Sequence, residues 1–560
     1  MRGRQTPADA VQAERAVDTA RRAALGALAD WPAAQPIPGI TMNSGGRLLI
    51  IGETGLALGW ADKLHDKLEL TVLATENAAA IEAPARHRYS LLIGQAVRLS
   101  GHLGAFELEW QTAAGDAIPG KLVTESFDLV LDLSATPLLR MTELPDGYQA
   151  PGPDPLDQAL AVIELLPLTG EFEKPQYVAL RQNLCAHSRA KLSGCDKCIE
   201  VCASAAIVAQ GDTVQVDPYL CQGCGTCASV CPSGALSYQY PRVADIGARM
   251  RAMLAAYREA GGADACLLFH SATAGRDLLA RAETRAGGLP APVLALETWS
   301  AEAVGLDLML AAIALGAGRV AILGAGSHDL TPLRQQAQIA ATILGGLGYG
   351  GEHVRVLEQS EPEALLGELR DWPTAQGVAS AASFCPLGDK RGTLDLAIAH
   401  LHAQAPLPQQ LVALPAGAPF GSVAASEACT LCMGCVGSCP ASALVGGTEA
   451  PTLSFIEHNC VQCGLCLQSC PENALTLTPR LLFEGARRER LLRQAEIFRC
   501  TSCGKPMGAR PLIEAMVSRL SGHSMFAGAD ALARLKMCGD CRVIDLVRNE
   551  DSIHASEMNP

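Results

Sequence analysis

Sixteen of the 22 cysteines in this 560-residue chain fall into four groups of four with regular spacing. Three groups read C-x2-C-x2-C-x3-C and are followed directly by proline. In the fourth, nine residues separate the first two cysteines, and alanine follows the last. The regular groups are Cys221, Cys224, Cys227 and Cys231; Cys429, Cys432, Cys435 and Cys439; and Cys460, Cys463, Cys466 and Cys470; the variant is Cys185, Cys195, Cys198 and Cys202. Thiols at this spacing in a long chain favour metal ligation over disulfide bonding.

The regular spacing is the one that holds a [4Fe–4S] cubane in bacterial ferredoxins. Its C-x2-C-x2-C loop wraps three thiolates around one cluster, and the fourth cysteine reaches the neighbouring cluster. We therefore expect four ligand sets, each built from two motifs. Set A is Cys185, Cys195, Cys198 and Cys231; set B is Cys202, Cys221, Cys224 and Cys227; set C is Cys429, Cys432, Cys435 and Cys470; and set D is Cys439, Cys460, Cys463 and Cys466.

Alternatives to this ligand assignment stay open. The motifs could be zinc knuckles or buried thiols instead of iron–sulfur sites. For set A, the nine-residue insertion could displace Cys185 and leave a labile or three-iron site. Around the motifs, the proline after each fourth cysteine predicts the start of a short helix, as at Pro232, Pro440 and Pro471. A Gly211-Asp212 turn inside 208–216 predicts a hairpin between the paired motifs.

A second kind of cysteine pattern occurs near the C-terminus. Two C-x2-C knuckles, Cys500 with Cys503 and Cys538 with Cys541, supply four soft thiolates. A closed tetrahedron of thiolates suits structural zinc, so we expect one zinc ion here, with a rubredoxin-like iron or simple thiols as alternatives. The 34 residues between the knuckles include a helical run at 511–520, which the metal would hold in place.

Hydrophobic runs between the cysteine motifs predict two α/β regions. Strand patterns occur at 47–52, 70–75 and 127–133, and again at 265–269, 292–296, 319–324 and 354–357. Helical stretches separate them, which favours parallel sheets. The expected fold is a multidomain α/β protein in which two Rossmann-like α/β domains alternate with two dicluster ferredoxin modules of the α+β class. The predicted ranges are 1–45 (helix and linker), 46–165 (first α/β unit), 166–245 (first cysteine module), 246–417 (second α/β unit), 418–482 (second cysteine module) and 483–560 (zinc-binding tail).

The first α/β unit contains a glycine pattern that resembles a dinucleotide fingerprint. Gly52, Gly55 and Gly59 follow a strand and open a helix, and Glu76 follows the next strand. The spacing is G-x2-G-x3-G instead of the fingerprint's G-x-G-x2-G. We expect a structural Rossmann-like domain, with a bound flavin or nicotinamide (NAD) as the alternative.

Charge and hydropathy exclude two classes of partner. The formal net charge is −14, which argues against nucleic acid because phosphate binding requires a basic face. The longest apolar stretch, 304–325, contains Asp307 and Arg319, so no membrane span is expected. These features, together with ligand-type cysteines, predict a cytoplasmic protein.

The chain resembles the multi-cluster 4Fe–4S ferredoxin-domain proteins of bacteria that accompany formate dehydrogenases and other molybdenum enzymes. The resemblance rests on 183–185, 194–198, 500–505 and 537–542. The region 263–358 is similar to the small iron–sulfur subunit that joins hydrogenases to heterodisulfide reductase, notably at 316–324. That subunit has cluster cysteines which this region lacks, so no fifth cluster is implied.

These observations predict an electron carrier with four [4Fe–4S] clusters. It would relay electrons between a dehydrogenase, formate dehydrogenase by resemblance, and another redox protein. No catalytic triad or carboxylate pair emerges, so no catalytic residue is assigned. Two other classes stay open: a flavin- or nicotinamide-linked oxidoreductase subunit, and an accessory or redox-sensing protein for molybdoenzyme assembly.

Overall fold

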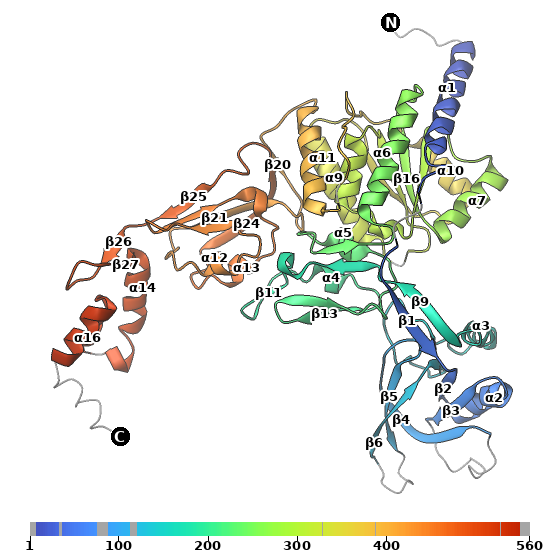
Figure 1. Ribbon diagram of the computed structural model, residues 1–560, viewed down its shortest axis with the longest axis horizontal. Coiled ribbons are helices and arrows are strands. Elements are labelled where there is room, and N and C mark those ends of the chain that lie inside the picture. The colour runs from blue at the N-terminus through green and yellow to red at the C-terminus, as the bar shows by residue number, and fades with distance from the viewer. Residues whose placement is uncertain are drawn as a thin grey trace.

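The fold was taken from a computed structural model, which describes residues 7–32, 36–75, 88–112, 120–327, 329–386, 388–526 and 528–548. In Figure 1 the first α/β unit lies at the bottom in blue and the second lies above it in green and yellow. The first cysteine module lies between these two units, and the second extends to the left toward the red tail. None of the described helices is both long and apolar enough to cross a membrane.

The first α/β unit contains a curled, seven-stranded mixed sheet in the order β6-β5-β4-β3-β2-β7-β8. The strands are β2 (Arg47–Gly52), β3 (Glu69–Ala74), β4 (Ser90–Ser100), β5 (Phe106–Thr112), β6 (Leu122–Phe127), β7 (Leu129–Asp132) and β8 (Tyr148–Gln149). The adjacent strands β4, β3, β2, β7 and β8 pair in parallel. Strands β4, β5 and β6 form an antiparallel meander. The expected parallel sheet is therefore wrong for β5 and β6.

The two faces of this sheet are covered differently. Helices α2 (Thr54–Leu64) and α3 (Pro155–Leu165) pack on the face that contains Leu48 and Ile50. Side chains of β5, such as Phe106, pack with Leu49 on the opposite face. The curl of the antiparallel meander thus replaces the second helical layer of an ordinary doubly wound fold.

The first cysteine module follows a long antiparallel ribbon of β1 (Gly39–Ser44) and β9 (Gly170–Pro175). In this module β10 (Val178–Leu180) pairs with β15 (Leu236–Tyr238). Two hairpins follow, β11 (Ser188–Arg189) with β12 (Leu192–Ser193), and β13 (Ile207–Gln210) with β14 (Thr213–Val216). The helical elements are η3 (Gln182–Leu184), α4 (Lys197–Glu200) and α5 (Thr226–Val230). The hairpin predicted between the paired motifs is confirmed by β13 and β14.

The second α/β unit is a three-layer sandwich around a parallel sheet in the order β17-β16-β18-β19. Its strands β16 (Cys266–Ser271), β17 (Val293–Thr298), β18 (Arg319–Leu323) and β19 (Val354–Leu357) confirm the four strands predicted from sequence. One face is covered by the N-terminal helix α1 (Pro7–Gly26) with α6 (Val243–Glu259), α8 (Leu306–Ala314), α9 (Thr331–Gly346) and α11 (Lys390–Ala403). The other face is covered by α7 (Ala274–Ala286) and α10 (Pro362–Asp371).

The second cysteine module shares its sheets with the flanking segments. Strand β24 (Leu475–Leu482) pairs with β21 (Gly421–Ala425) and β20 (Leu411–Ala413). Strand β23 (Thr452–Phe455) pairs with β22 (Leu444–Gly446) and with β25 (Arg490–Gln494) from the tail. Short helices α12 (Gly434–Ser438) and α13 (Leu465–Gln468) complete the module. The tail adds β26 (Ile497–Arg499), β27 (Pro506–Ala509), α14 (Arg510–Leu520), α15 (Ala529–Leu535) and α16 (Gly539–Arg548).

The short helices predicted after the fourth cysteines do not form. Pro232, Pro440 and Pro471 lie in bends and turns that lead directly into strands. The short helices α4, α5, α12 and α13 instead begin one residue before the third cysteine of each motif and end before the fourth. The physical reason is a left-handed residue three positions after each fourth cysteine, which is incompatible with a helix beginning there: Ala205, Gly234, Ser442 and Asn473.

Candidate metal centres

The structure brings the cysteines of set A together from two different motifs. Burial, together with the neighbouring Cys231, Cys195 and Cys185, raises the pKa of the Cys198 thiol to about 12. Cys231 is the fourth cysteine of the other motif, so cysteines of both motifs meet at this point. A small pocket is lined by these four cysteines and mainly by apolar side chains.

The cysteines of set B are likewise gathered around the buried Cys227. Burial raises the pKa of this thiol, and the nearby Cys224, Cys221 and Cys202 act in the same direction. Cys202 comes from the variant motif and the other three from the regular one. Within the first cysteine module, the fourth cysteine of each motif thus lies near cysteines of the other motif.

Sets C and D repeat this arrangement in the second cysteine module. Burial raises the pKa of Cys435 to about 11, with Cys429, Cys432 and Cys470 as charged neighbours. Burial, together with the nearby cysteines of set D and Cys435 of set C, also raises the pKa of Cys466 to about 12. A pocket of about 350 Å³ is lined by all four cysteines of set D. Four soft thiolates around a space with apolar walls fit a [4Fe–4S] cluster.

The backbone of the three regular motifs shares an unusual conformation. The second residue after each first cysteine has a positive φ, as at Gly223, Leu431 and Gln462. The residue after each second cysteine does too, at Gly225, Met433 and Gly464. Left-handed backbone costs a non-glycine residue roughly 1–2 kcal/mol, so its recurrence at equivalent positions reflects a common constraint. That constraint is the tight loop that directs three thiols toward one point.

The nine-residue insertion of the variant motif folds away from set A as a hairpin. Strands β11 and β12 pair across a two-residue left-handed turn at Ala190 and Lys191. The N–H of Cys195 donates to the carbonyl of Ala186 over 2.9 Å, which closes the hairpin beside Cys185. The insertion therefore leaves the first and second cysteines adjacent, which favours a complete ligand set.

The two cysteine modules meet between sets A and D. Cys463 of set D is near enough to contribute to the raised pKa of Cys195, although burial is the main cause. A Cβ placed on Gly194 would lie 2.6 Å from Cγ of Leu465, so the backbone of one module touches a side chain of the other. The Nζ of Lys197 also donates to the carbonyl of Gly417 over 2.5 Å.

The first turn of α11 holds both modules from the second α/β unit. Lys390 donates to the carbonyls of Ala228 and Ser229 in α5, beside set B and Cys231. The next residue, Arg391, donates to the carbonyl of His458 over 2.6 Å, two residues before Cys460 of set D. Burial lowers the pKa of both basic groups. Consecutive residues thus fix the relative position of the two modules.

The first module also covers the carboxyl edge of the second parallel sheet. Helix α5 packs against η4 (Ala301–Ala303), which follows β17, and against α9, which follows β18. This edge is where open α/β sheets usually bind small ligands. Here a cysteine-bearing helix occupies part of it, so the second α/β unit serves as a support for the cluster loops.

Set B faces an open cleft of about 830 Å³ at the junction of three parts of the chain. Its lining includes Cys202 and Cys224 of set B, together with the acidic side chains of Glu143, Glu200, Glu302 and Asp329. Glu143 and Glu302 add to the rise in the pKa of Cys224, which burial mainly raises to about 12. Set B therefore lies beside an open cleft.

The four tail cysteines lie together, with all their sulfur atoms within 4.8 Å of one another. Cys500 and Cys503 come from the turn between β26 and β27, and Cys538 and Cys541 come from the start of α16. The N–H of Cys538 donates to Sγ of Cys500 over 3.2 Å and lowers the pKa of Cys500 to about 6. Four close thiols, one already favoured as thiolate, fit a tetrahedral metal site.

The glycine pattern of the first α/β unit does not reproduce the roles of a dinucleotide fingerprint. The strand–turn–helix is present, and a Cβ on Gly52 would lie 2.9 Å from Cβ of Leu133. Around Gly59, however, no atom lies within 4 Å of an added Cβ, so it does not serve close packing of helix on sheet. Glu76 lies outside the described residues.

Sequence reasoning missed the residues that other parts of the chain contribute to the cysteine sets. Lys174 lies near Cys221, Glu143 and Glu302 lie near Cys224, and Lys390 lies near Cys231. In the sequence each of them is 47 or more residues from that cysteine. No spacing marks them, because only the tertiary fold brings them near. Gly194 is adjacent to a motif but has no special backbone conformation that would signal its contact.

Comparison with known protein families supports the cysteine assignment at the level of domains. Residues 214–237 match a 4Fe-4S binding domain, and residues 428–475 match a 4Fe-4S dicluster domain. The second match includes all eight cysteines of sets C and D, whereas the variant motif at 185–202 lies outside both matches. No curated protein showed a significant match to the chain. The chain therefore contains two ferredoxin-type 4Fe–4S domains and is an iron–sulfur protein.

Proposed function

We propose that this chain is an electron-transfer protein with four [4Fe–4S] clusters, one in each of sets A to D. When bound, each cluster supplies a one-electron redox centre. The observation that carries the proposal is the meeting of the two modules at Gly194 and Leu465, beside Cys195 and Cys463. It arranges the sets in the order B, A, D, C without a gap between modules.

The protein's own residues would hold this row together. Exchange of fourth cysteines links A with B and C with D, and the contact between modules links A with D. Lys390 and Arg391 fix that contact from a rigid helix. Eight of the sixteen ligand cysteines are buried, and Cys432 of set C is exposed. Solvent access to the ligand sulfurs is one of the factors that set cluster potentials.

We further propose that the tail binds one zinc ion at Cys500, Cys503, Cys538 and Cys541. Zinc has no redox chemistry, and a closed thiolate site contributes to folding. The metal would join the β26–β27 hairpin to α16 and act as a structural cap. It would take no part in electron flow.

The partners would be redox proteins that exchange electrons at the cleft beside set B. Four carboxylates and one guanidinium, that of Arg140, line the cleft. This excess of negative charge suits a partner with a basic surface, since charge complementarity speeds association and orients it. A dehydrogenase would be one partner, and formate dehydrogenase is the one that the family resemblance suggests. That last identification rests on analogy alone.

An electron count tests the proposal. The purified protein is reduced anaerobically, separated from reductant by gel filtration, and mixed with oxidised cytochrome c as a basic acceptor. Each chain should deliver about four electrons, one for each cubane. Delivery should slow at high salt and in the Glu200→Gln variant. Delivery of two electrons or fewer, or release of a flavin that accounts for them, would contradict it.

A further inference from the structure

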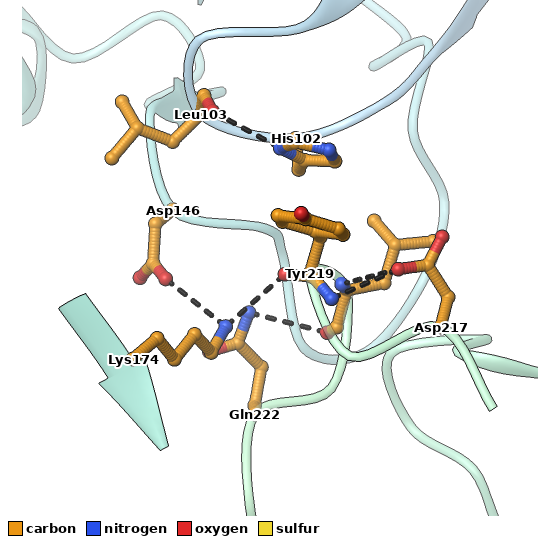
Figure 2. A network of polar contacts seen from close by, with 8 residues as sticks. His102, Leu103, Asp146, Lys174, Asp217, Tyr219 and Gln222 are labelled. Atoms are coloured by element: carbon orange, nitrogen blue, oxygen red, sulfur yellow. Dashed lines mark hydrogen bonds and ion pairs between the residues drawn. The ribbon is translucent and has the colours of Figure 1, made fainter. Parts of the chain in front are cut away.

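Lys174 is a buried lysine that lies beside set B. It belongs to β9, and only 8% of its side chain is exposed. Figure 2 shows its Nζ between three oxygen atoms from two other parts of the chain. They are Oδ2 of Asp146 at 3.3 Å, the carbonyl of Tyr219 at 3.2 Å and Oε1 of Gln222 at 3.5 Å.

Two of these three oxygens belong to the loop that carries Cys221. Tyr219 precedes this cysteine by two residues, and Gln222 follows it directly. Lys174 thus clamps the loop on both sides of the first ligand of the regular motif. A flexible surface lysine could not do this, because its charge would remain in water.

The same loop is held from its other side by the first α/β unit. The ring of His102 stacks on Tyr219 with centroids 4.3 Å apart and planes 9° apart. Asp217 accepts hydrogen bonds from the N–H groups of Tyr219 and Leu220 over 2.9 and 3.4 Å. In Figure 2, Tyr219 lies between His102 and Lys174. The loop is therefore fixed in place, and so is the charge beside it.

Among the described residues, the carboxylate that pairs with Lys174 is not fully buried. This partner, Asp146, is half exposed, and the other two contacts are neutral oxygens. The field of the ammonium therefore extends toward Cys221, where it acts against the effect of burial on the thiol. In a buried environment such a charge acts more strongly than it would in water.

We propose that Lys174 is a positioning residue that raises the reduction potential of the set B centre. The inference rests on the proposed function, because it assigns set B a [4Fe–4S] cluster. Reduction adds one negative charge to the cluster, and a fixed positive charge nearby stabilises the reduced form. Glu143 and Glu302 lie on the cleft side of set B and act in the opposite sense. The balance between them and Lys174 sets the potential at the end of the row where a partner docks.

The test is a potentiometric titration of the full-length protein, followed by EPR. Lys174→Met should lower one midpoint potential and leave the others in place. We expect at least a tenfold fall in the equilibrium constant for that reduction, which equals about 59 mV for one electron. Lys174→Arg, which keeps the charge, should restore most of the wild-type value. Lys121→Met, at an exposed lysine of the first α/β unit, should change no potential.

A second variant removes a negative charge beside set B. With it, the test does not depend on knowing in advance which EPR signal belongs to set B. Glu143→Gln should raise the midpoint of the same signal that Lys174→Met lowers, and the double variant should lie between them. Unchanged potentials in both variants would overturn the proposal. Equal shifts of the midpoint potentials of all signals would also overturn it. So would an equal fall in the midpoint potential in Lys174→Met and Lys174→Arg, because that would indicate a merely structural role.

Iron analysis of each variant separates this proposal from the proposed function. If the wild-type protein lacks four clusters, the electron-relay proposal fails, whereas the response of a set B signal to Lys174 is still measured. If Lys174→Met does not retain its iron, Lys174→Arg and Glu143→Gln decide the outcome. If the midpoint potential then fell or stayed unchanged in Glu143→Gln, this result would count against the role of charge at this site.

Discussion

Single residues in the cluster loops adopt left-handed backbone that glycine accommodates best. Three positions after the fourth cysteine, one motif has Gly234, but the equivalent residue in another is Ser442, at φ 49°. Ser442 is exposed, so its side chain contributes little packing. The serine is therefore held in a costly conformation by the loop around it.

Ser442→Gly should stabilise the second cysteine module by about 1 kcal/mol, because it removes the strain of left-handed backbone. The measurement is the anaerobic rate at which the visible cluster absorbance is lost on heating, which should fall. Ala441→Gly is the matched control: it adds glycine at an adjacent residue without positive φ and should raise that rate. A Ser442→Gly protein no more stable than Ala441→Gly would contradict the strain argument.

The tail cysteines give a second prediction at this scale. Cys538→Ser should lose about one zinc per chain and loosen the segment from Cys500 to Cys541, while iron content and cluster reduction persist. Metal analysis and limited proteolysis measure both effects. Cys385→Ser, at an exposed cysteine outside all five sites, should retain zinc and iron. Loss of iron or of a reducible EPR signal in Cys538→Ser would show that the tail belongs to the electron path.

Elements that are buried on both faces were the easiest to predict from sequence. Strands β2 and β18 are apolar along nearly their whole length, and their predicted bounds differ from the observed ones by one residue at most. The meander of β4, β5 and β6 was missed. Its residues alternate between buried and exposed, as in β5, which is typical of an antiparallel ribbon and not of the parallel sheet that was expected.

The metal-site cysteines could be assigned from spacing because a short loop must supply most ligands of each set. Their supporting residues could not. Lys390 and Arg391 open a helix 162 and 67 residues from their respective partners Ala228 and His458, so no local pattern marks them. Likewise, the contact of β12 with α13 depends on how separate modules pack. Local spacing specifies a site, whereas its surroundings depend on the tertiary fold.

The junction of β12 and α13 gives a prediction at the scale of elements. Gly194→Val would place its Cβ 2.6 Å from both Cγ of Leu465 and the carbonyl oxygen of Ala186, and should push sets A and D apart. Because Ala186 lies beside Cys185, the iron content of this variant shows whether set A itself is disturbed. In the cytochrome c assay, about half of the electrons should then be delivered slowly, since sets C and D lie beyond the junction. Ser193→Val, at the neighbouring exposed position, is the control and should keep wild-type kinetics. Iron content should stay unchanged in both variants. Uniform delivery from Gly194→Val would place the path elsewhere.

At the scale of the whole molecule, the two α/β units support the cysteine modules from different sides. The second unit holds both modules through α11, and the first unit fixes the set B loop through His102 and Tyr219. The chain order therefore alternates support and cluster module, while in space the four cysteine sets form one row. This arrangement is the reason that we interpret the chain as a continuous electron path and not as two independent ferredoxins.

Metal analysis combined with EPR tests this interpretation most directly. The protein is purified anaerobically and assayed for iron and acid-labile sulfide, and its fully reduced form is examined for magnetic coupling between clusters. The account predicts about sixteen irons per chain, from sixteen cysteines at four per cubane, with coupled signals. A value near eight irons without coupling would contradict it, because at most two of the four sets could then hold complete clusters.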